Sequence, residues 1–330
     1  MRDPYVEPRL RWDWLQESDL PDVADLVQAA EHLDDPIRHV DLAELERLYR
    51  TPDADPGRNA VVGRDRSGSV VATAWGHPRR GEGEHRYWLE FIVHPAWRYQ
   101  HVGEACAVWL RDIALDWHEE LQLDGVDEPL WAGAYVDEKL TFRVRQFEQA
   151  GFVAERWFAD MHVTFAETDP HALPLVLPDG VRLVDFDMSR SEAVRRAHNR
   201  TYATVPGAQR VSRAVWEHML DVATLRRESS AVALAGDEVV GYAISADNEP
   251  DWPALGLREG WTEFLGTVPE WRGRGIARAL LTQCLRGYAD AGLAGAGLGV
   301  DADSSHAYRL FSDLGYRATD RLVLMGLRRD

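Results

Sequence analysis

The stretch TVPEWRGRGIA, residues 267–277, decides how the fold of this 330-residue chain is interpreted. It joins a β-type run, Trp261 to Val268, to a helical pattern that begins at Ile276. A strand that enters a helix through a glycine loop points free backbone N–H groups and the positive end of the helix dipole at one spot. Because Gly273 and Gly275 have no Cβ, a phosphate can approach that backbone closely. The stretch therefore predicts an anion site.

The same pattern occurs earlier in the chain. Residues 93–103 align without gaps on residues 267–277, and residues 147–152 align on residues 311–316. Each copy follows the order β-hairpin, strand, loop, helix, strand, helix, strand. We therefore predict an α+β fold with two tandem domains, each a mixed, mainly antiparallel sheet flanked by helices.

The two copies are not equivalent at the loop. Tyr99 and His101 stand in the first copy where the second has glycines, so we expect the first loop to be degenerate. Two turn clusters separate the copies. They predict an N-terminal domain at residues 1–167, a linker at 168–180, and a C-terminal domain at 181–330 that carries the site.

Composition limits the class of protein. Hydrophobic residues make up 45% of the chain, enough for two cores, but no run approaches the roughly 18 apolar residues of a membrane helix. The start, Met1 to Tyr5, lacks the apolar core of a secretory signal, which predicts a cytoplasmic protein without membrane partners. Cys106 and Cys284 lie far apart in helical patterns, so we expect buried, inert thiols.

The net charge indicates which classes of binding partner to expect. The chain has 37 basic and 55 acidic residues, a net charge of −18, which disfavours nucleic acid and favours a cationic partner. Lys139 is the single lysine, which excludes an ATP-type loop with its Gly-Lys pair. Arg278 stands where the dinucleotide fingerprint requires a third glycine, so the loop does not match a dinucleotide-binding site.

The loop also satisfies a more specific sequence motif. Arg272, Gly275 and Ala277 satisfy Gln/Arg-x-x-Gly-x-Gly/Ala, and the loop resembles the pyrophosphate loop of the GNAT superfamily of acyl-CoA-dependent N-acyltransferases. The tandem layout is similar to that of two-domain bacterial members of this superfamily. The resemblance covers the second half of the chain by element order and the first half more loosely.

The resemblance implies a reaction and a cofactor site. It implies transfer of an acetyl or other short acyl group from acyl-CoA, as co-substrate, to a primary amine of a small molecule such as an amino sugar, an antibiotic or a peptide. No metal ion is implied. The implied CoA-binding residues are Leu265, Gly266, Thr267, Arg272, Gly273, Arg274, Gly275, Ile276 and Ala277.

The catalytic residues are less well marked. Glu263 lies on the predicted strand with the facing of Leu265, and a carboxylate partly buried in such a cleft is a candidate general base. The alternative is an edge-exposed strand glutamate. Phe311 and Phe147 occupy the two places where the family often has a tyrosine as proton donor. Tyr308, one helical turn earlier, is then the candidate acid, or else a packing residue.

Acidic residues indicate the kind of acceptor. Asp247, Glu249, Asp251 and Glu259 lie in the loop before the predicted catalytic strand, where they would either attract a cationic amine or remain solvated loop charges. The internal duplication fits a monomer, and a homodimer stays open. The alternative function is a catalytically impaired CoA sensor or interaction protein, suggested by the two phenylalanines.

Overall fold

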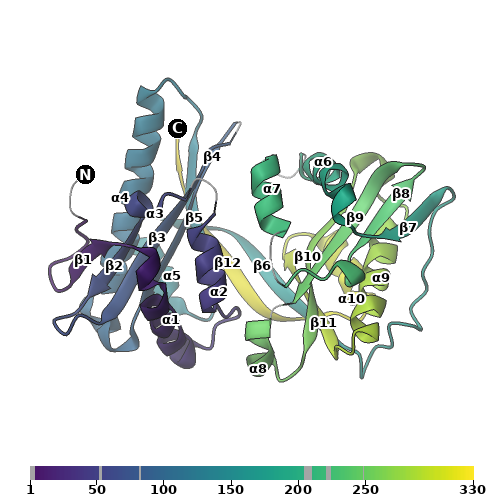
Figure 1. Ribbon diagram of the computed structural model, residues 1–330, viewed down its shortest axis with the longest axis horizontal. Coiled ribbons are helices and arrows are strands. Elements are labelled where there is room, and N and C mark those ends of the chain that lie inside the picture. Colours follow the sequence, from purple (N-terminus) through teal and green to yellow (C-terminus); the bar gives the residue numbers. More distant parts are fainter. Residues whose placement is uncertain (1–3, 52–53, 82, 204–209, 221–223, 248) are drawn as a thin grey trace. The chain divides into compact units, whose positions relative to one another are not determined.

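The computed structural model describes residues 4–51, 54–81, 83–203, 210–220, 224–247 and 249–330. Residues 1–3, part of the segment used in the signal-peptide argument, lie outside the described residues. The chain divides into two compact units, one of Met1–Arg156 with Leu322–Asp330 and one of Trp157–Arg321 (Figure 1). Each is a mixed sheet with helices, so the α+β prediction is confirmed. No described helix has the length and apolarity needed to span a membrane.

The N-terminal unit has the strand order β1-β2-β3-β4-β5-β12. The β-hairpin expected in this copy, the strand that follows it and the next helix are all present, and the helix begins at Val102. The strands are β1 Arg11–Trp14, β2 Ala60–Arg64, β3 Val70–Arg79, β4 His85–Val93, β5 Leu130–Asp137 and β12 Arg317–Arg329. The α-helices are α1 Leu20–Asp34, α2 Leu42–Tyr49, α3 Pro56–Asn59, α4 Val102–Leu123 and α5 Thr141–Gln149.

The C-terminal unit has the order β6-β11-β10-β9-β8-β7. In it β10 and β11 run parallel, and the other pairs are antiparallel. The strands are β6 Val153–Thr164, β7 Val181–Asp185, β8 Ala231–Ala235, β9 Glu238–Asp247, β10 Glu259–Thr267 and β11 Gly295–Asp301. The described α-helices are α6 Ser191–Tyr202, α7 Arg213–Leu220, α8 Trp252–Leu255, α9 Ile276–Asp290 and α10 Ser305–Ser312.

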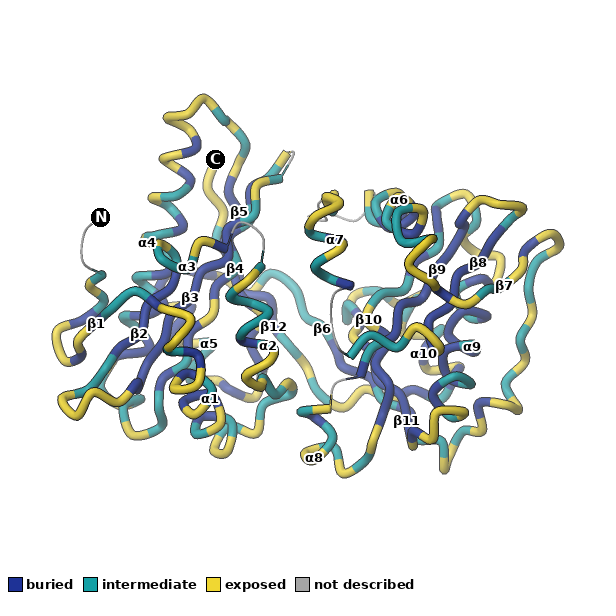
Figure 2. The backbone as a smooth tube through the Cα atoms, in the orientation of Figure 1, coloured by how far each residue is buried: buried dark blue, intermediate teal, exposed yellow. Residues whose placement is uncertain are grey.

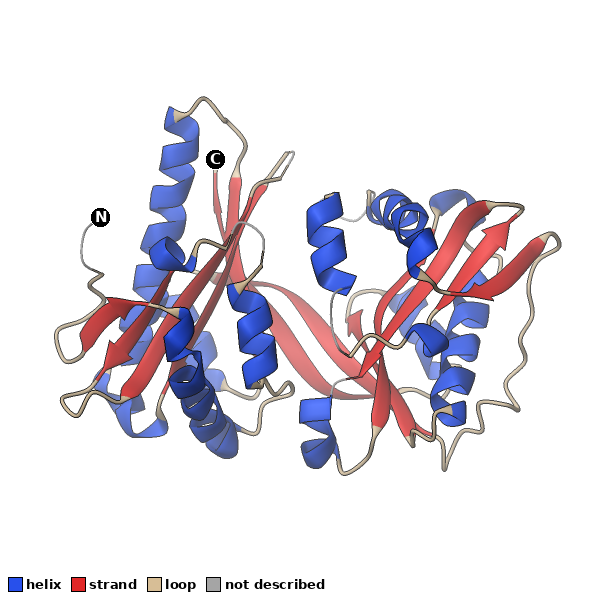
Figure 3. Cartoon of the chain, viewed as in Figure 1, coloured by secondary structure: helices blue, strands red, loops and turns tan. Residues whose placement is uncertain are grey.

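The helix α9 covers one face of the C-terminal sheet. The helical pattern expected from Ile276 onward is confirmed, and Ile276, Leu280, Cys284 and Tyr288, which lie on one face of the helix, are buried. A Cβ on Gly241 of β9 would lie 2.8 Å from the Ile276 side chain, so the backbone of β9 packs directly against this side chain of α9. The opposite face carries α6, and the strands between these helices are the buried centre of the unit (Figures 2 and 3).

Two strands continue from one unit into the other. Residues 153–156 of β6 belong to the N-terminal unit, and residues 157–164 belong to the C-terminal unit, where they pair with β11. Conversely, residues 322–329 of β12 pair with β5 of the N-terminal unit. Each unit therefore receives one strand from the other half of the sequence. The predicted domain boundaries, at residues 167 and 181, did not anticipate this exchange. The predicted linker, residues 168–180, lies within the C-terminal unit.

Candidate active site

The parallel strands β10 and β11 separate after three residues. Their pairing ends at Trp261 and Gly297, whereas β10 stays paired with β9 as far as Thr267. The sheet is therefore open on one side of β10 from residue 262 onward. An extended ligand can enter such an opening and use the unpaired backbone of the strand.

The open edge of β10 presents the backbone of two predicted CoA-binding residues. Val268 donates its N–H to Val240 of β9 at 3.0 Å. Because backbone groups alternate along a strand, those of Leu265 and Thr267 point away from β9, toward the opening. Gly266 lies between them, and a Cβ there would come within 2.5 Å of the Tyr242 ring. Glycine is therefore required at 266 by packing.

Two side chains reach this edge. The Tyr202 hydroxyl donates to the Leu265 carbonyl at 3.4 Å, and Arg272 Nε donates to the Thr267 carbonyl at 3.2 Å. The Thr267 hydroxyl is buried and has no hydrogen-bond partner within the described part of the chain. An orphaned buried hydroxyl costs free energy unless a ligand supplies its partner.

The loop after β10 has the geometry of an anion site. Gly273 and Gly275 have φ of 73° and 83°, and no atom lies within 4 Å of a Cβ built on either residue. Within the described chain, the N–H groups of residues 273–277 form no hydrogen bond to a backbone carbonyl. These donors stand at the N-terminus of a 15-residue helix, whose dipole adds to their attraction for an anion.

The two loop arginines have different environments. Arg272, expected to engage phosphate, donates instead to the backbone carbonyls of Thr267 and Thr201, the latter at 2.6 Å. It thereby fastens the loop to the end of α6. Arg274 is exposed and stacks over the Trp271 ring, 4.8 Å from its centroid. Arg274 is therefore the better placed of the two to meet a phosphate.

Glu263 lies at a β-bulge, which the sequence pattern did not reveal. Thr262 pairs with Ser245 and Phe264 with Ile244, so Glu263 is the extra residue of β10. The bulge offsets the alternation by one residue, and Glu263 therefore does not share the facing of Leu265. Its side chain is exposed, so the partial burial expected for it is absent. Burial, and then the charge of Glu263, raise the pKa of the Tyr202 phenol.

The candidate acid is also at the surface. Tyr308 is 37% exposed in the first half of α10. Phe311 is buried, with its ring centroid 6.2 Å from that of Tyr316, so the position of the usual tyrosine belongs to the core here. The role of Tyr308 stays a prediction.

Sequence reasoning missed an aromatic cluster beside the bulge. His198 of α6 is buried, and its Nδ1 lies 2.9 Å from the Tyr242 hydroxyl. Its ring also packs against Tyr202, Trp216 and Phe264. Burial lowers the pKa of His198 to about 4, so the ring is neutral at pH 7. The amphipathic segment 191–202 was the available signal, but the hydrogen-bond partner of His198, Tyr242, is 44 residues away in sequence.

The acidic residues expected to attract the acceptor are partly used inside the fold. Asp247 is buried and forms an ion pair with Arg226. Glu259 is 3% exposed, and its Oε2 lies 2.9 Å from Nδ1 of His162. Glu249 is exposed. The predicted carboxylate lining is therefore reduced, because two of its members are neutralised by fixed cationic or imidazole partners.

The first copy keeps the strand separation but not the loop. There β4 pairs with β5 only over His85–Trp88, and its register with β3 is uninterrupted, so no bulge is present. His101 has a φ of 60°, but Tyr99 does not have the positive φ of its counterpart Gly273. Tyr99 is 96% exposed. The N–H-rich turn of the second copy is therefore not reproduced.

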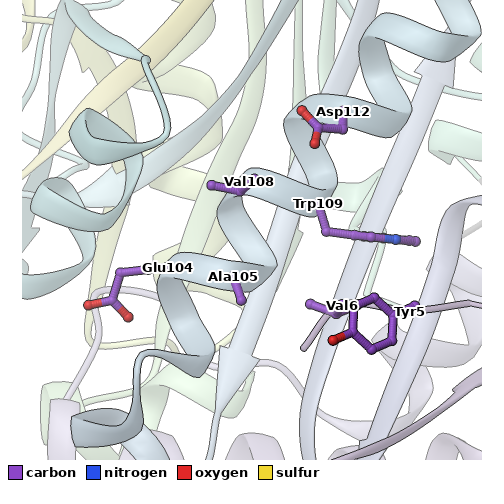
Figure 4. A pocket seen from close by; sticks show the side chains of 7 residues that line it. All are labelled: Tyr5, Val6, Glu104, Ala105, Val108, Trp109 and Asp112. Atoms are coloured by element: carbon purple, nitrogen blue, oxygen red, sulfur yellow. The ribbon is translucent and has the colours of Figure 1, made fainter. Parts of the chain in front are cut away.

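The start of α4 is also acidic. Glu104 aligns with Arg278 of the second copy. Together with Asp112 it lines a cavity of about 310 Å³ at this helix (Figure 4). The remaining lining residues are Tyr5, Val6, Ala105, Val108 and Trp109. Two carboxylates oppose the binding of a diphosphate here.

Comparisons with known proteins agree with this geometry. Residues 192–316 match the model of the acetyltransferase (GNAT) family. Mycothiol acetyltransferase from Kocuria rhizophila is 28% identical over 234 residues, which are 69% of this chain and 71% of that protein.

Two solved structures share the fold. A GCN5-related N-acetyltransferase from Sphaerobacter thermophilus superposes with a TM-score of 0.71 at 22% identity, covering 98% of this chain and 97% of that one. A tandem GNAT protein from the clavulanic acid biosynthesis pathway gives a TM-score of 0.65 at 15% identity, covering 97% and 98%. Residues 192–316 therefore form a GNAT acetyltransferase domain, that of an acyl-CoA-dependent N-acetyltransferase, in a chain that has the fold of a tandem GNAT protein.

Proposed function

We propose that the C-terminal unit transfers the acetyl group of acetyl-CoA to a primary amine of a small molecule. The observation that carries the proposal is the continuity of the open β10 edge with the free N–H groups of residues 273–277. The diphosphate binds at the loop, with Arg274 beside it. The arm bearing the thioester follows the backbone of Leu265 and Thr267 toward the point where β10 and β11 meet.

The acetyl transfer then needs an amine without its proton. The amine lone pair attacks the thioester carbonyl carbon and forms the C–N bond. Collapse of the tetrahedral intermediate breaks the C–S bond, and the thiolate leaves, taking a proton from the new ammonium or from Tyr308. A thiol with a pKa of about 8.5 leaves readily as a thiolate, so the phenylalanine at 311 is compatible with turnover.

The acceptor is proposed to be a cationic small-molecule amine. Glu263 is an exposed carboxylate on the bulge, two residues after Trp261, where the β10–β11 pairing ends. An ammonium group is attracted to such a carboxylate before it loses its proton. In this assignment Glu263 binds and orients the amine, and it remains the base candidate offered by the sequence.

The test is an acceptor screen with the full chain. Purified protein is incubated with acetyl-CoA and a panel of amino sugars, aminoglycosides, polyamines and short peptides, and free thiol is measured. We expect thiol release with some amines, loss of it in Gly275→Glu, and a raised KM for the amine in Glu263→Gln. If acetyl-CoA raises the melting temperature but no amine releases thiol, the chain is a CoA sensor and the transferase proposal is wrong.

A further inference from the structure

Glu259 and His162 lie where β10 and β11 meet. Glu259 is the first residue of β10 and pairs with Gly295 of β11. His162 of β6 pairs with Gly297 of β11 from the other side, and Gly297 also pairs with Trp261. The glutamate and the histidine thus approach each other across β11, at the closed end of the opening along β10.

The strand between them leaves room for the side chains of Glu259 and Trp261. A Cβ on Gly297 would lie 2.7 Å from Glu259 Oε1 and 2.7 Å from the Trp261 ring, so any larger residue displaces them. The Trp252 indole donates to the Glu259 carbonyl at 3.0 Å and fixes the start of β10. Glu259 is therefore held in place, with Oε2 directed at His162 Nδ1, 2.9 Å away.

The imidazole has one engaged and one available nitrogen. Donation from Nδ1–H to the Glu259 carboxylate leaves Nε2 with a lone pair, and no described residue forms a hydrogen bond with Nε2. Burial alone lowers the pKa of His162. The hydrogen bond and charge of Glu259, with the charges of Asp160 on β6 and Asp320 on β12, outweigh it and raise the pKa. On the β11 side, the residue that pairs with His162 is Gly297, which carries no charge.

A purely structural role does not account for the pair. The β6–β11 ladder already joins seven consecutive residue pairs, from Gly295–Thr164 to Asp301–Phe158, without help from side chains. A buried carboxylate–imidazole pair therefore adds little to the pairing of these two strands. Its position at the closed end of the proposed thioester channel gives it a chemical use.

We propose that His162 accepts the proton of the acceptor ammonium through Nε2 and that Glu259 is its positioning residue. The proposal rests on the proposed function. The ammonium N–H bond breaks, its proton goes to Nε2, and the freed amine attacks the thioester. The imidazolium later releases that proton to solvent. An imidazole is a stronger base than an exposed carboxylate, so this transfer from an ammonium group is less uphill.

The experiment measures kcat/KM against pH for an amine that the wild type accepts. In the wild type we expect kcat/KM to fall at low pH, which is the acid limb of the profile. In Glu259→Gln this limb should move to lower pH, because a negative charge next to His162 is gone. In His162→Gln the limb should be absent. His162→Gln should also lower kcat by about 10²- to 10⁴-fold. Added imidazole should restore part of its rate. His171→Gln, at an exposed histidine that pairs with Asp290, is the matched control and should leave the profile unchanged.

The two proposals fail in different ways. If the wild type releases no thiol with any amine, the proposed function fails. If the wild type turns over and a folded His162→Gln keeps the acid limb, the proton-acceptor role is refuted while the transferase stands. Should His162→Gln not fold, Glu259→Gln decides the question, since an unmoved limb there also overturns the proposal.

Discussion

Replacing Gly275 by alanine separates backbone strain from diphosphate binding. Gly275 has a φ of 83° at the start of α9, and Gly292 has a φ of 75° just after the end of the same helix. Nothing lies within 4 Å of a Cβ at either position, so neither substitution causes a clash. An L-residue in this conformation costs about 1–2 kcal/mol. Gly275→Ala and Gly292→Ala should therefore lower the free energy of unfolding by similar amounts.

Only one of the two variants should bind acetyl-CoA less well. A Cβ at 275 obstructs the approach of a phosphate to the loop, and the loss of one charge-assisted hydrogen bond costs about 1.5–3 kcal/mol. Affinity then falls by about 10- to 100-fold. At a concentration of 100 times the wild-type Kd, acetyl-CoA stabilises the wild type and Gly292→Ala by about 2.7 kcal/mol, and Gly275→Ala by about 0.4–1.4 kcal/mol.

The assay is chemical unfolding with and without acetyl-CoA. The comparison within each variant cancels the strain that both substitutions introduce. If acetyl-CoA stabilises Gly275→Ala as much as it stabilises Gly292→Ala, the diphosphate does not bind at this loop, and the assignment of the site to residues 273–277 is refuted.

Three further predictions concern the loops and the buried histidine. Calorimetry should give one acetyl-CoA per chain, because the turn at His101 lacks the second positive φ, and two equal sites would contradict this. Arg274→Ala should weaken acetyl-CoA binding with little loss of stability, whereas Arg272→Ala should cost about 1–3 kcal/mol of stability through two lost carbonyl contacts; the reverse pattern would exchange their roles. For His198 the folded pKa, about 4, lies below the ordinary 6.5, so the unfolded chain binds more protons between these values and stability falls as pH drops from 6.5 to 4. Urea unfolding at pH 7 and pH 5 should therefore differ less in His198→Gln than in the wild type, and equal differences would rule out this histidine as a source.

Much of the fold is predictable because its signals are local. The hairpin of β8 and β9 turns at Gly236, which has the positive φ of a tight turn, and α9 repeats its buried residues at helical spacing. The loop glycines were identified for the same reason, since the conformations of Gly273 and Gly275 are those that only glycine adopts without strain. Each of these features is specified within about a dozen residues.

The candidate site was harder to predict because its decisive features are not local. The bulge at Glu263 contains no glycine or proline and arises from the register with β9, so an alternating pattern gives it the wrong facing. Arg272 reaches the Thr201 carbonyl, 71 residues away in sequence, which turns an expected phosphate ligand into a structural one. His162 belongs by sequence to the first repeat, so a search confined to the second repeat does not reach it.

The exchanged strands change what a degenerate repeat contributes. Without residues 157–164, β11 would keep its three-residue pairing with β10 and lose the seven-residue ladder on its other side. An unpaired edge at that place exposes backbone groups and invites aggregation. The first repeat, although its own loop lacks the free N–H turn, therefore supplies the strand that completes the sheet of the proposed active site. The first repeat therefore lacks the anion loop and still contributes to the fold of the second, so that Tyr99, which stands where the second repeat has Gly273, does not make the first repeat dispensable.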